Sequence, residues 1–454
     1  MNRKEEYQEL MIELEKEVPE IVDTLERARK RRNDMIYRPL IGIAAAFTVF
    51  VFLVNFSMPV AYACSQIPGL RELAEAVTFS RSLSDAVDNE YVQTMNLIQR
   101  DGEVSAKIEY LIVDQKQVNV FYRLYSDVYQ EISAEPTVCL ADGSGSPSCS
   151  WMVNDYDLAN GELRSLTIDF VEDDVPDSLK IYLDIRDDSI FSEEGEEATE
   201  ADLFHPEGTE EEEYIAHFEF LLEFDPEFTA TGKEIAVNKT VELEGQKIKI
   251  EEIAIYPTHM RINISDDSEN TAWLRALYFY IETDWGMKFE PVAQGITATG
   301  SGETNTMASF RADSTYFYNA KNLKIVITGA EWLDKDMEKV YVNLETGETG
   351  ELPEGVEFYS AEEKASGWIL QFKAVQRKEG HHHQLMLSTY YDMKGNEYSI
   401  NSWSTGENVL NNNDSEKYFI EELFLTDYHE KELFVSPNYS NVWTAETPIE
   451  VEVK

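Results

Sequence analysis

The sequence predicts a mainly β protein with a single transmembrane helix, a short cytoplasmic helical tail and tandem β-sandwich-like extracellular domains. Three observations predict this class: an apolar run without charge, a cationic segment directly before it, and alternating apolar and polar residues over most of the remaining chain. With 454 residues the chain is too long for one core. We predict a cytoplasmic tail at 1–38 and a transmembrane helix at 39–60. A first juxtamembrane and β domain follows at 61–190, then an acidic linker or loop at 191–214. The second β domain is predicted at 215–350 and the third at 351–454.

The apolar run is LIGIAAAFTVFVFLVNFSM, Leu40 to Met58. As a helix it would extend roughly 28 Å, which is close to the hydrocarbon thickness of a bilayer. Basic residues cluster just before the run, whereas the first basic residue after it is Arg71. Positive charge stays on the cytoplasmic side, so we expect a single-pass protein of the cell membrane, in contact with lipid, with its N-terminus inside and its C-terminus outside.

A cleaved signal peptide is the competing interpretation of this segment. Ala61 and Ala63 form an A-x-A-like site just past the apolar run, which makes them candidate cleavage residues. The apolar core of a signal peptide is usually about 7 to 15 residues long, and a charged leader of 38 residues is unusual. These lengths favour the membrane anchor.

Charge separates the two sides of the apolar run. The chain has 38 Lys plus Arg against 87 Asp plus Glu, a net charge of −49. Residues 1–38 contain 9 basic and 10 acidic residues, so almost all of the excess acid follows the run. A surface of this sign excludes non-specific binding to nucleic acid.

The tail has an apolar stripe at helical spacing. It includes the candidate partner-binding residues Leu10, Leu14, Val18, Ile21 and Leu25. A segment this short cannot bury such a stripe alone, so it would lie on the membrane, on a copy of itself or in the groove of a partner. The alternative is a loosely ordered tail that only leads into the membrane helix.

Beyond the membrane the pattern predicts antiparallel hairpins. KIEYLIVDQKQVNVFY from Lys107 aligns with KIEEIAIYPTHMRINI from Lys249, 142 residues later, with apolar residues at matching positions. This repeat favours duplicated β domains, although any two amphipathic hairpins align to some degree. Further alternating runs predict a third domain, closed by a strand from Pro448 to Val453.

The acidic stretch and the cysteines each leave two interpretations. Residues 191–214 include EEGEEATEADLF and EGTEEEEY, which predict a solvated linker rather than a calcium loop, because the ligand spacing of an EF-hand is missing. Cys139 and Cys149 flank a Gly/Ser/Pro-rich loop, so they are either a local disulfide or two unrelated thiols.

The sequence contains no recognisable catalytic or metal motif. His381, His382 and His383 are adjacent, and neighbouring residues of a strand point to opposite faces, so they predict a turn or surface tract rather than a metal site. There is no phosphate-binding loop and no nucleophile elbow. We therefore expect no enzyme, no cofactor and no metal.

Several segments carry a family resemblance. These are IPGLRELAEAV at Ile67–Val77, AVDNEYVQ at Ala86–Gln93, the hairpin through Leu111–Asp114 and Val118, and PVAYA at Pro59–Ala63. They resemble a bacterial family of ectodomains of unknown function that is associated with extracytoplasmic-function sigma factors. Residues 235–264 look like the second β domain found downstream in such proteins.

The resemblance implies a transmembrane anti-sigma factor or envelope-signal sensor. Its tail would hold an extracytoplasmic-function sigma factor, and proteolysis near Ala63 would release the signal. Residues 1–38 contain neither His nor Cys, so the zinc motif of many anti-sigma domains is missing and a simple helix would make the contact. The alternative is a cell-surface ligand-binding or adhesion protein without a cytoplasmic regulatory role.

Overall fold

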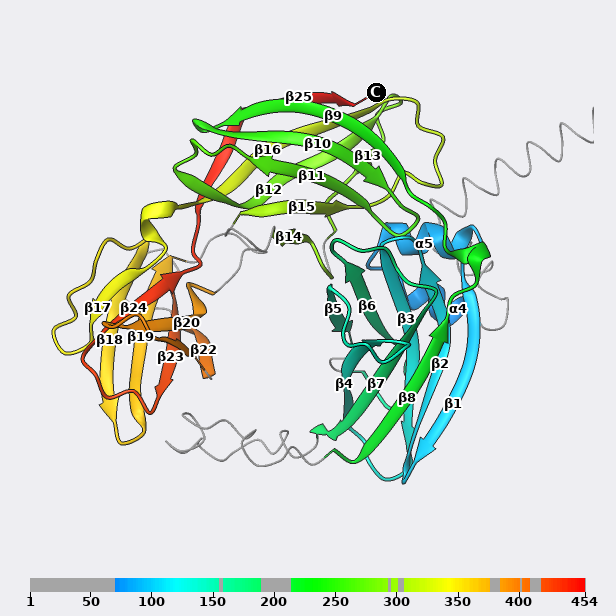
Figure 1. Ribbon diagram of the computed structural model, residues 1–454, viewed down its shortest axis with the longest axis horizontal. Helices are drawn as coiled ribbons and strands as arrows, with labels where there is room; N and C mark the ends of the chain where they lie inside the picture. Colours follow the sequence, from blue (N-terminus) through cyan, green and yellow to red (C-terminus); the bar gives the residue numbers. More distant parts are fainter. Residues whose placement is uncertain are drawn as a thin grey trace, which may run out of the picture. The chain divides into compact units, whose positions relative to one another are not determined.

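The computed structural model describes residues 70–154, 158–188, 214–292, 295–300, 306–375, 384–400, 402–408 and 418–453. The chain divides into two compact units, Met1–Ala74 and Glu75–Lys454, and the second unit holds all of the β structure described below. Two short helices precede the strands, α4 at Leu70–Ala76 and α5 at Arg81–Asp88 (Figure 1). The described chain is mainly β, as the alternating pattern predicts.

The first β domain is a sandwich of two antiparallel sheets. Its larger sheet has the order β1-β2-β3-β6-β5, with β1 at Gln93–Asp101, β2 at Val104–Val113, β3 at Gln117–Ser126, β6 at Arg164–Phe170 and β5 at Cys149–Asn154. Its smaller sheet has the order β4-β7-β8, with β4 at Ile132–Leu140, β7 at Ser178–Asp187 and β8 at Ala216–Glu223.

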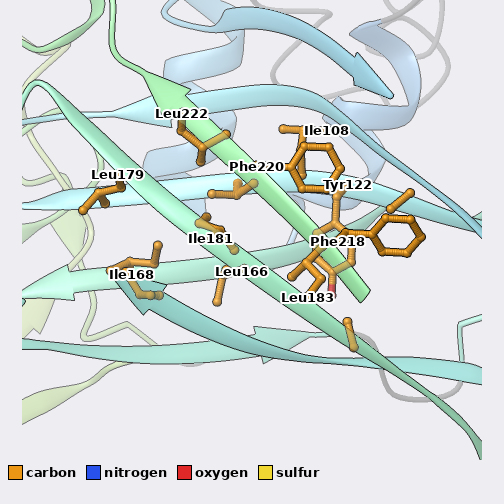
Figure 2. Packing of buried hydrophobic residues seen from close by; sticks show 14 of the residues in the cluster. Ile108, Tyr122, Leu166, Ile168, Leu179, Ile181, Leu183, Phe218, Phe220 and Leu222 are labelled. Carbon is orange, nitrogen blue, oxygen red and sulfur yellow. The ribbon is translucent and has the colours of Figure 1, made fainter. Parts of the chain in front are cut away.

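Alternation along the strands builds the core of this domain. In β8 every second residue is buried, so Phe218, Phe220 and Leu222 lie on one face while Glu219 and Leu221 between them are exposed. These side chains gather with others from β2, β3, β6 and β7, including Ile108 and Ile181 (Figure 2). Each fully buried side chain of this size contributes about 1.5 to 3 kcal/mol, which offsets the entropy cost of ordering the strands.

The second β domain repeats the first. Its sheets have the orders β9-β10-β11-β15-β14 and β13-β12-β16-β25. The strands are β9 at Lys233–Leu243, β10 at Gln246–Ile255, β11 at Met260–Asp266, β12 at Ala272–Thr283, β13 at Lys288–Phe289, β14 at Ala298–Gly300, β15 at Met307–Ala312, β16 at Leu323–Asp334 and β25 at Asn441–Val453. The larger sheets of the two domains have the same order of strands, so that β1, β2, β3, β6 and β5 correspond to β9, β10, β11, β15 and β14.

Backbone irregularities recur at the 142-residue offset that aligns the two hairpins. The β2–β3 register shifts directly after Ile108, and the β10–β11 register shifts directly after Ile250. Asn96 in β1 and Asn238 in β9 both have positive φ, 58° and 51°. Amphipathic alternation alone does not require bulges and left-handed residues at matching positions, so the predicted repeat is confirmed.

The third β domain is inserted into the second. Its sheets have the orders β17-β24-β20-β21 and β18-β19-β23-β22. The strands are β17 at Val340–Asn343, β18 at Val356–Lys364, β19 at Gly367–Val375, β20 at Met386–Asp392, β21 at Glu397–Ser399, β22 at Ser402–Asn408, β23 at Tyr418–Thr426 and β24 at Glu432–Pro437. The chain leaves the second domain after β16 and returns to it as β25, which pairs with β16.

Two strands differ from the predicted domain boundaries. The sequence-based boundary at residue 215 assigns 216–223 to the second domain, but β8 pairs with β7 and completes the first. The alternating pattern predicts that the strand at the C-terminus closes the third domain, but β25 pairs with β16 and closes the second. Both strands pair with a partner that is distant in sequence, and alternation does not specify such a partner.

No helix among the described residues is long and apolar enough to cross a membrane. The apolar run Leu40–Met58, the acidic stretch 191–213 and the histidines 381–383 lie outside the described residues.

Candidate functional site

Two aspartates of the first domain form one half of a buried charged cluster. Asp114 follows β2 in the turn to β3, where its Oδ1 accepts hydrogen bonds from the backbone N–H groups of Lys116 and Gln117, both at 2.9 Å. Asp169 is on β6, and both aspartates are fully buried. A buried carboxylate is costly unless it is paired, so each requires partners from outside its own turn or strand.

The second domain supplies the remaining hydrogen-bond donors to the Asp114 carboxylate, and these donors belong to a longer hydrogen-bond network. Thr258, in the turn between β10 and β11, donates to Asp114 Oδ2 from its backbone N–H at 3.0 Å and from its hydroxyl at 2.6 Å. His259 Nδ1 lies 2.8 Å from the same hydroxyl, and Arg261 Nε donates to His259 Nε2 at 2.9 Å. This network assigns a neutral imidazole with its proton on Nδ1. Burial lowers the pKa of His259 well below its ordinary value, and the charges of Arg261 and Arg311 act in the same direction.

Asp169 is clamped by two arginines of the second domain. Arg311, on β15, donates to both carboxylate oxygens, from Nε at 3.2 Å and from an Nη at 2.7 Å. Arg261, on β11, places an Nη 3.1 Å from Asp169 Oδ1 and donates to the carbonyl oxygen of Phe170 at 2.9 Å. Asp169 therefore binds two guanidinium groups directly, whereas Asp114 is linked to Arg261 through Thr258 and His259. The formal charges of the two aspartates and the two arginines, all buried, sum to zero.

The cluster fixes the first two domains against each other. Charged groups in a low-dielectric site hold their geometry because moving one leaves another unpaired. Buried charge pairs add little net stability over apolar contacts, but they specify one arrangement of the elements that carry them. The chemistry here is that of a rigid joint, and we assign no reaction to it.

Helix α5 is attached to the second domain by its first residues. Ser80 caps the helix by accepting a hydrogen bond from Leu83 N–H at 3.3 Å. Arg81 then reaches the second domain, where it donates to the carbonyl oxygen of Lys288 and to the Tyr318 hydroxyl, both at 3.0 Å. Its guanidinium carbon lies 4.3 Å from the ring centroid of Phe289, a cation–π contact.

Two further side chains of α5 complete this attachment. Ser82 donates from its backbone N–H and its hydroxyl to Asp313 Oδ1, at 3.3 and 3.2 Å, and accepts from Ser314 N–H at 2.7 Å. Asp85 accepts a hydrogen bond from the Tyr318 hydroxyl at 3.1 Å. We call Arg81, Ser82 and Asp85 with their partners on the second domain the α5 clasp.

Burial raises the pKa of Asp85 to about 6. The hydrogen bond from Tyr318 and the charge of Arg81 lower it, while the carboxylates of Asp88 and Asp313 raise it further. Burial also raises the pKa of Asp313. The α5 clasp thus holds two acids in an environment that disfavours their charged forms.

Most residues singled out from the sequence are not in this site. The tail residues Leu10, Leu14, Val18, Ile21 and Leu25, and the cleavage candidates Ala61 and Ala63, lie outside the described residues. Cys139 is on β4 in the smaller sheet and Cys149 begins β5 in the larger one. Both are free thiols, so the structure does not contain the cross-link that the loop between them suggested.

Neither the cluster nor the α5 clasp is predicted by a sequence motif. The available signal was a charge inside an otherwise apolar strand, as in LTIDF for Asp169, MRINI for Arg261 and ASFRA for Arg311. A single charge in a strand is usually solvent-exposed, so only the fold reveals that these charges meet. Among the described residues no group of His, Cys, Asp and Glu is arranged to hold a metal ion.

Comparisons with known proteins match two parts of the chain. Residues 31–126 match a domain of unknown function, DUF4179, and residues 232–358 match a family of unknown function, DUF5643. No curated protein matches the chain. The crystal structure of a conserved domain protein from Bacillus anthracis is similar at 15% sequence identity and a TM-score of 0.39, covering 57% of this chain and 84% of that chain.

Proposed function

We propose that this protein is a single-pass membrane regulator, an anti-sigma factor or envelope-signal sensor, whose N-terminal tail holds an extracytoplasmic-function sigma factor at the membrane. The observation that carries the proposal is the α5 clasp. It ties a helix that follows the apolar run closely in sequence to the second β domain, through Arg81, Ser82 and Asp85. An external domain coupled in this way can influence the segment that leads into the membrane.

The span of one family match supports the same proposal. DUF4179 covers residues 31–126, so it begins before the apolar run and ends with β3. One family model therefore covers both the apolar run and the first three strands. A receptor that transmits an external signal requires this continuity, whereas an adhesion module needs only an anchor.

The proposed route of the signal has two rigid steps. The buried cluster at Asp114 and Asp169 joins the first and second domains, and the α5 clasp joins the second domain to α5. A ligand that binds one arrangement of these joints better than another shifts the population of arrangements by its difference in affinity. The tail would then hold or release the sigma factor according to that population.

Capture of a sigma factor by the full-length protein tests the proposal. The solubilised full-length chain should retain an extracytoplasmic-function sigma factor from the lysate of its own cells, identified by mass spectrometry. Replacing Leu14 and Ile21 with Glu should abolish retention, because charge on the apolar stripe prevents helix-in-groove binding. As the matched control, Gln8→Glu with Thr24→Glu adds the same charge to polar positions of the tail and should leave retention intact.

The adhesion alternative makes the opposite forecast. A cell-surface binding protein would retain no sigma factor, and removing residues 1–38 would not change what its external domains bind. Equal retention by the stripe variant and the control variant would also contradict the proposed role of the tail.

A further inference from the structure

A large cavity lies where the third domain joins the second. Its volume is about 1060 Å³, which is at the upper end of the range for small-molecule sites and suits a segment of a few residues. The walls come from β12, β16 and β25, from the β9–β10 turn, and from loops of the third domain. The lining residues used below are Glu244, Asp334, Glu354, Tyr278, Trp332 and Tyr439.

Three carboxylates line this cavity and none has a partner within the described residues. Glu244 is in the tight turn between β9 and β10, Asp334 ends β16, and Glu354 precedes β18. Asp334 stands at the start of a short 3₁₀ turn, Lys335–Met337, without capping it. Among the described residues that line the cavity, none is basic. The cavity therefore attracts a cation and repels an anion.

Aromatic side chains form part of the cavity wall, where Tyr278 is half-buried and Trp332 and Tyr439 are only 3% and 6% exposed. Tyr278, Trp332 and Tyr439 line the same cavity as the carboxylates. Aromatic faces attract ammonium and guanidinium groups through the ring quadrupole, and they also cover the methylene stems of Lys and Arg. Unpaired carboxylates beside aromatic rings form the combination that recognises basic side chains.

The cavity also contains the edge of a sheet. Asn441, Val442 and Thr444 belong to β25, which is the last of the described strands in its sheet and, among those strands, pairs with β16 alone. Val442 is 40% exposed. A strand edge presents N–H and C=O groups that an extended peptide can extend by main-chain hydrogen bonds.

Short contacts position this edge at the point where the inserted domain returns. Arg275 on β12 donates to Asn438 Oδ1 at 2.8 Å, and the Ser440 hydroxyl donates to Glu331 on β16. Both contacts hold residues immediately before β25 against the second domain. The lining residues of β25 are therefore held in place beside Asp334.

We propose that this cavity binds a basic peptide in extended conformation, whose main chain pairs with the edge of β25 and whose Lys or Arg side chains meet Glu244, Asp334 and Glu354. The net charge of −49 favours the approach of such a peptide over long distances. This inference rests on the proposed sensor function for its biological meaning, since it names the class of signal. The binding itself does not depend on the tail.

Binding to the full-length protein in detergent micelles tests the proposal. The probe is a fluorescently labelled peptide of alternating lysine and threonine with blocked ends, followed by anisotropy. Asp334→Asn with Glu354→Gln should weaken binding about tenfold, because two charges are lost from the cavity. The matched control, Glu351→Gln with Glu363→Gln, removes the same charge from exposed residues of the third domain and should weaken binding less than about twofold.

Two further probes distinguish the contribution of the peptide backbone to binding from the contribution of its positive charge. The same peptide with alternate amides N-methylated should bind poorly, because it cannot complete the strand pairing. Spermine, a cation without a peptide backbone, should compete only weakly. Equal losses in both double variants, or unimpaired binding of the methylated peptide or of spermine, would overturn the assignment.

The outcomes for the cavity and for the proposed function stay distinct. Absence of peptide binding overturns this inference even when the tail retains a sigma factor. Peptide binding that requires Asp334 and Glu354 supports the inference even when the tail retains none.

Discussion

Asp169 lies between two guanidinium groups of another domain, in a place that water does not reach. Its contacts with Arg261 and Arg311 are individually strong, but the cost of burying the charges cancels much of that gain. Asp169 instead favours one arrangement of the two domains over competing arrangements. A domain arrangement that separates Asp169 from its arginines would leave buried charges unpaired, so competing arrangements are penalised.

Asp169→Asn is expected to destabilise the protein by about 3 to 5 kcal/mol, because the shape is kept while one arginine loses its counter-charge. Urea unfolding followed by intrinsic fluorescence measures the change. Adding Arg311→Met should recover part of the loss, since the remaining buried charges, Asp114 and Arg261, balance again. The control Lys431→Ala removes an exposed ion pair with Glu345 and should leave the transition almost unchanged.

Two results would contradict the description of this cluster as dry and charge-balanced. One is a decrease in the free energy of unfolding below about 1 kcal/mol for Asp169→Asn, and the other is a double variant that is less stable than the single variant.

At the scale of elements, helix α5 depends on pH through Asp85. The carboxyl has a pKa of about 6 when α5 is docked, against an ordinary value of 3.8. The docked state therefore binds the proton more tightly than the undocked state. Docking is therefore strengthened as the pH falls from about 6 toward 3.8. Asp313, whose pKa is also raised by burial, contributes in the same direction.

Amide hydrogen exchange of α5 should report this dependence. After correction for intrinsic exchange rates, residues 83–88 should open less often at pH 5 than at pH 7. Asp85→Asn should remove most of the difference, because the amide cannot titrate. Asp127→Asn, at an exposed aspartate outside the clasp, serves as the control. Equal opening at both pH values in the unmodified protein would show that Asp85 does not govern docking.

Elements formed by local pairing could be predicted from the sequence. The hairpins β2–β3 and β10–β11 follow from alternation and short turns, and their alignment predicts the repeated domain. The pairings of β7 with β8 and of β16 with β25 could not be predicted in the same way. Between these partners lie an acidic stretch in one case and a whole domain in the other, and burial patterns do not specify which distant strand is the partner.

The same limit applies to the site. Asp114 and Thr258 come from two copies of one hairpin turn, and Arg261 follows the second turn on β11, so the sequence could suggest that Asp114 and Thr258 occupy related positions. It could not suggest that the turns face each other. The lining of the cavity could not be predicted from the sequence either. Glu244, Asp334 and Asn441 come together only because the chain leaves the second domain and returns to it.

At the scale of the whole molecule, the repeat explains where the third domain is located. In the first domain the connection from β7 to β8 contains the acidic stretch, and in the second the equivalent connection from β16 to β25 contains β17 to β24. The two ends of that connection lie side by side, because Trp332 of β16 pairs with Asn441 of β25. An insertion at such a position leaves the pairing of its host strands intact.

Replacing residues 336–439 with a short Gly/Ser linker should therefore leave the first and second domains folded. The shortened chain should keep its β-type circular dichroism, and hydrogen exchange of α5 should remain slow, because the α5 clasp contains no residue of the third domain. It should also lose binding of the lysine–threonine peptide, since Glu354 and Tyr439 are removed. In contrast, truncation after Ser440 should unfold the second domain, because β16 loses β25 and the core loses Val451 and Val453. If the truncated chain were as stable as the chain with the linker, β25 would not be an integral strand of the second domain, and the inserted arrangement would be wrong.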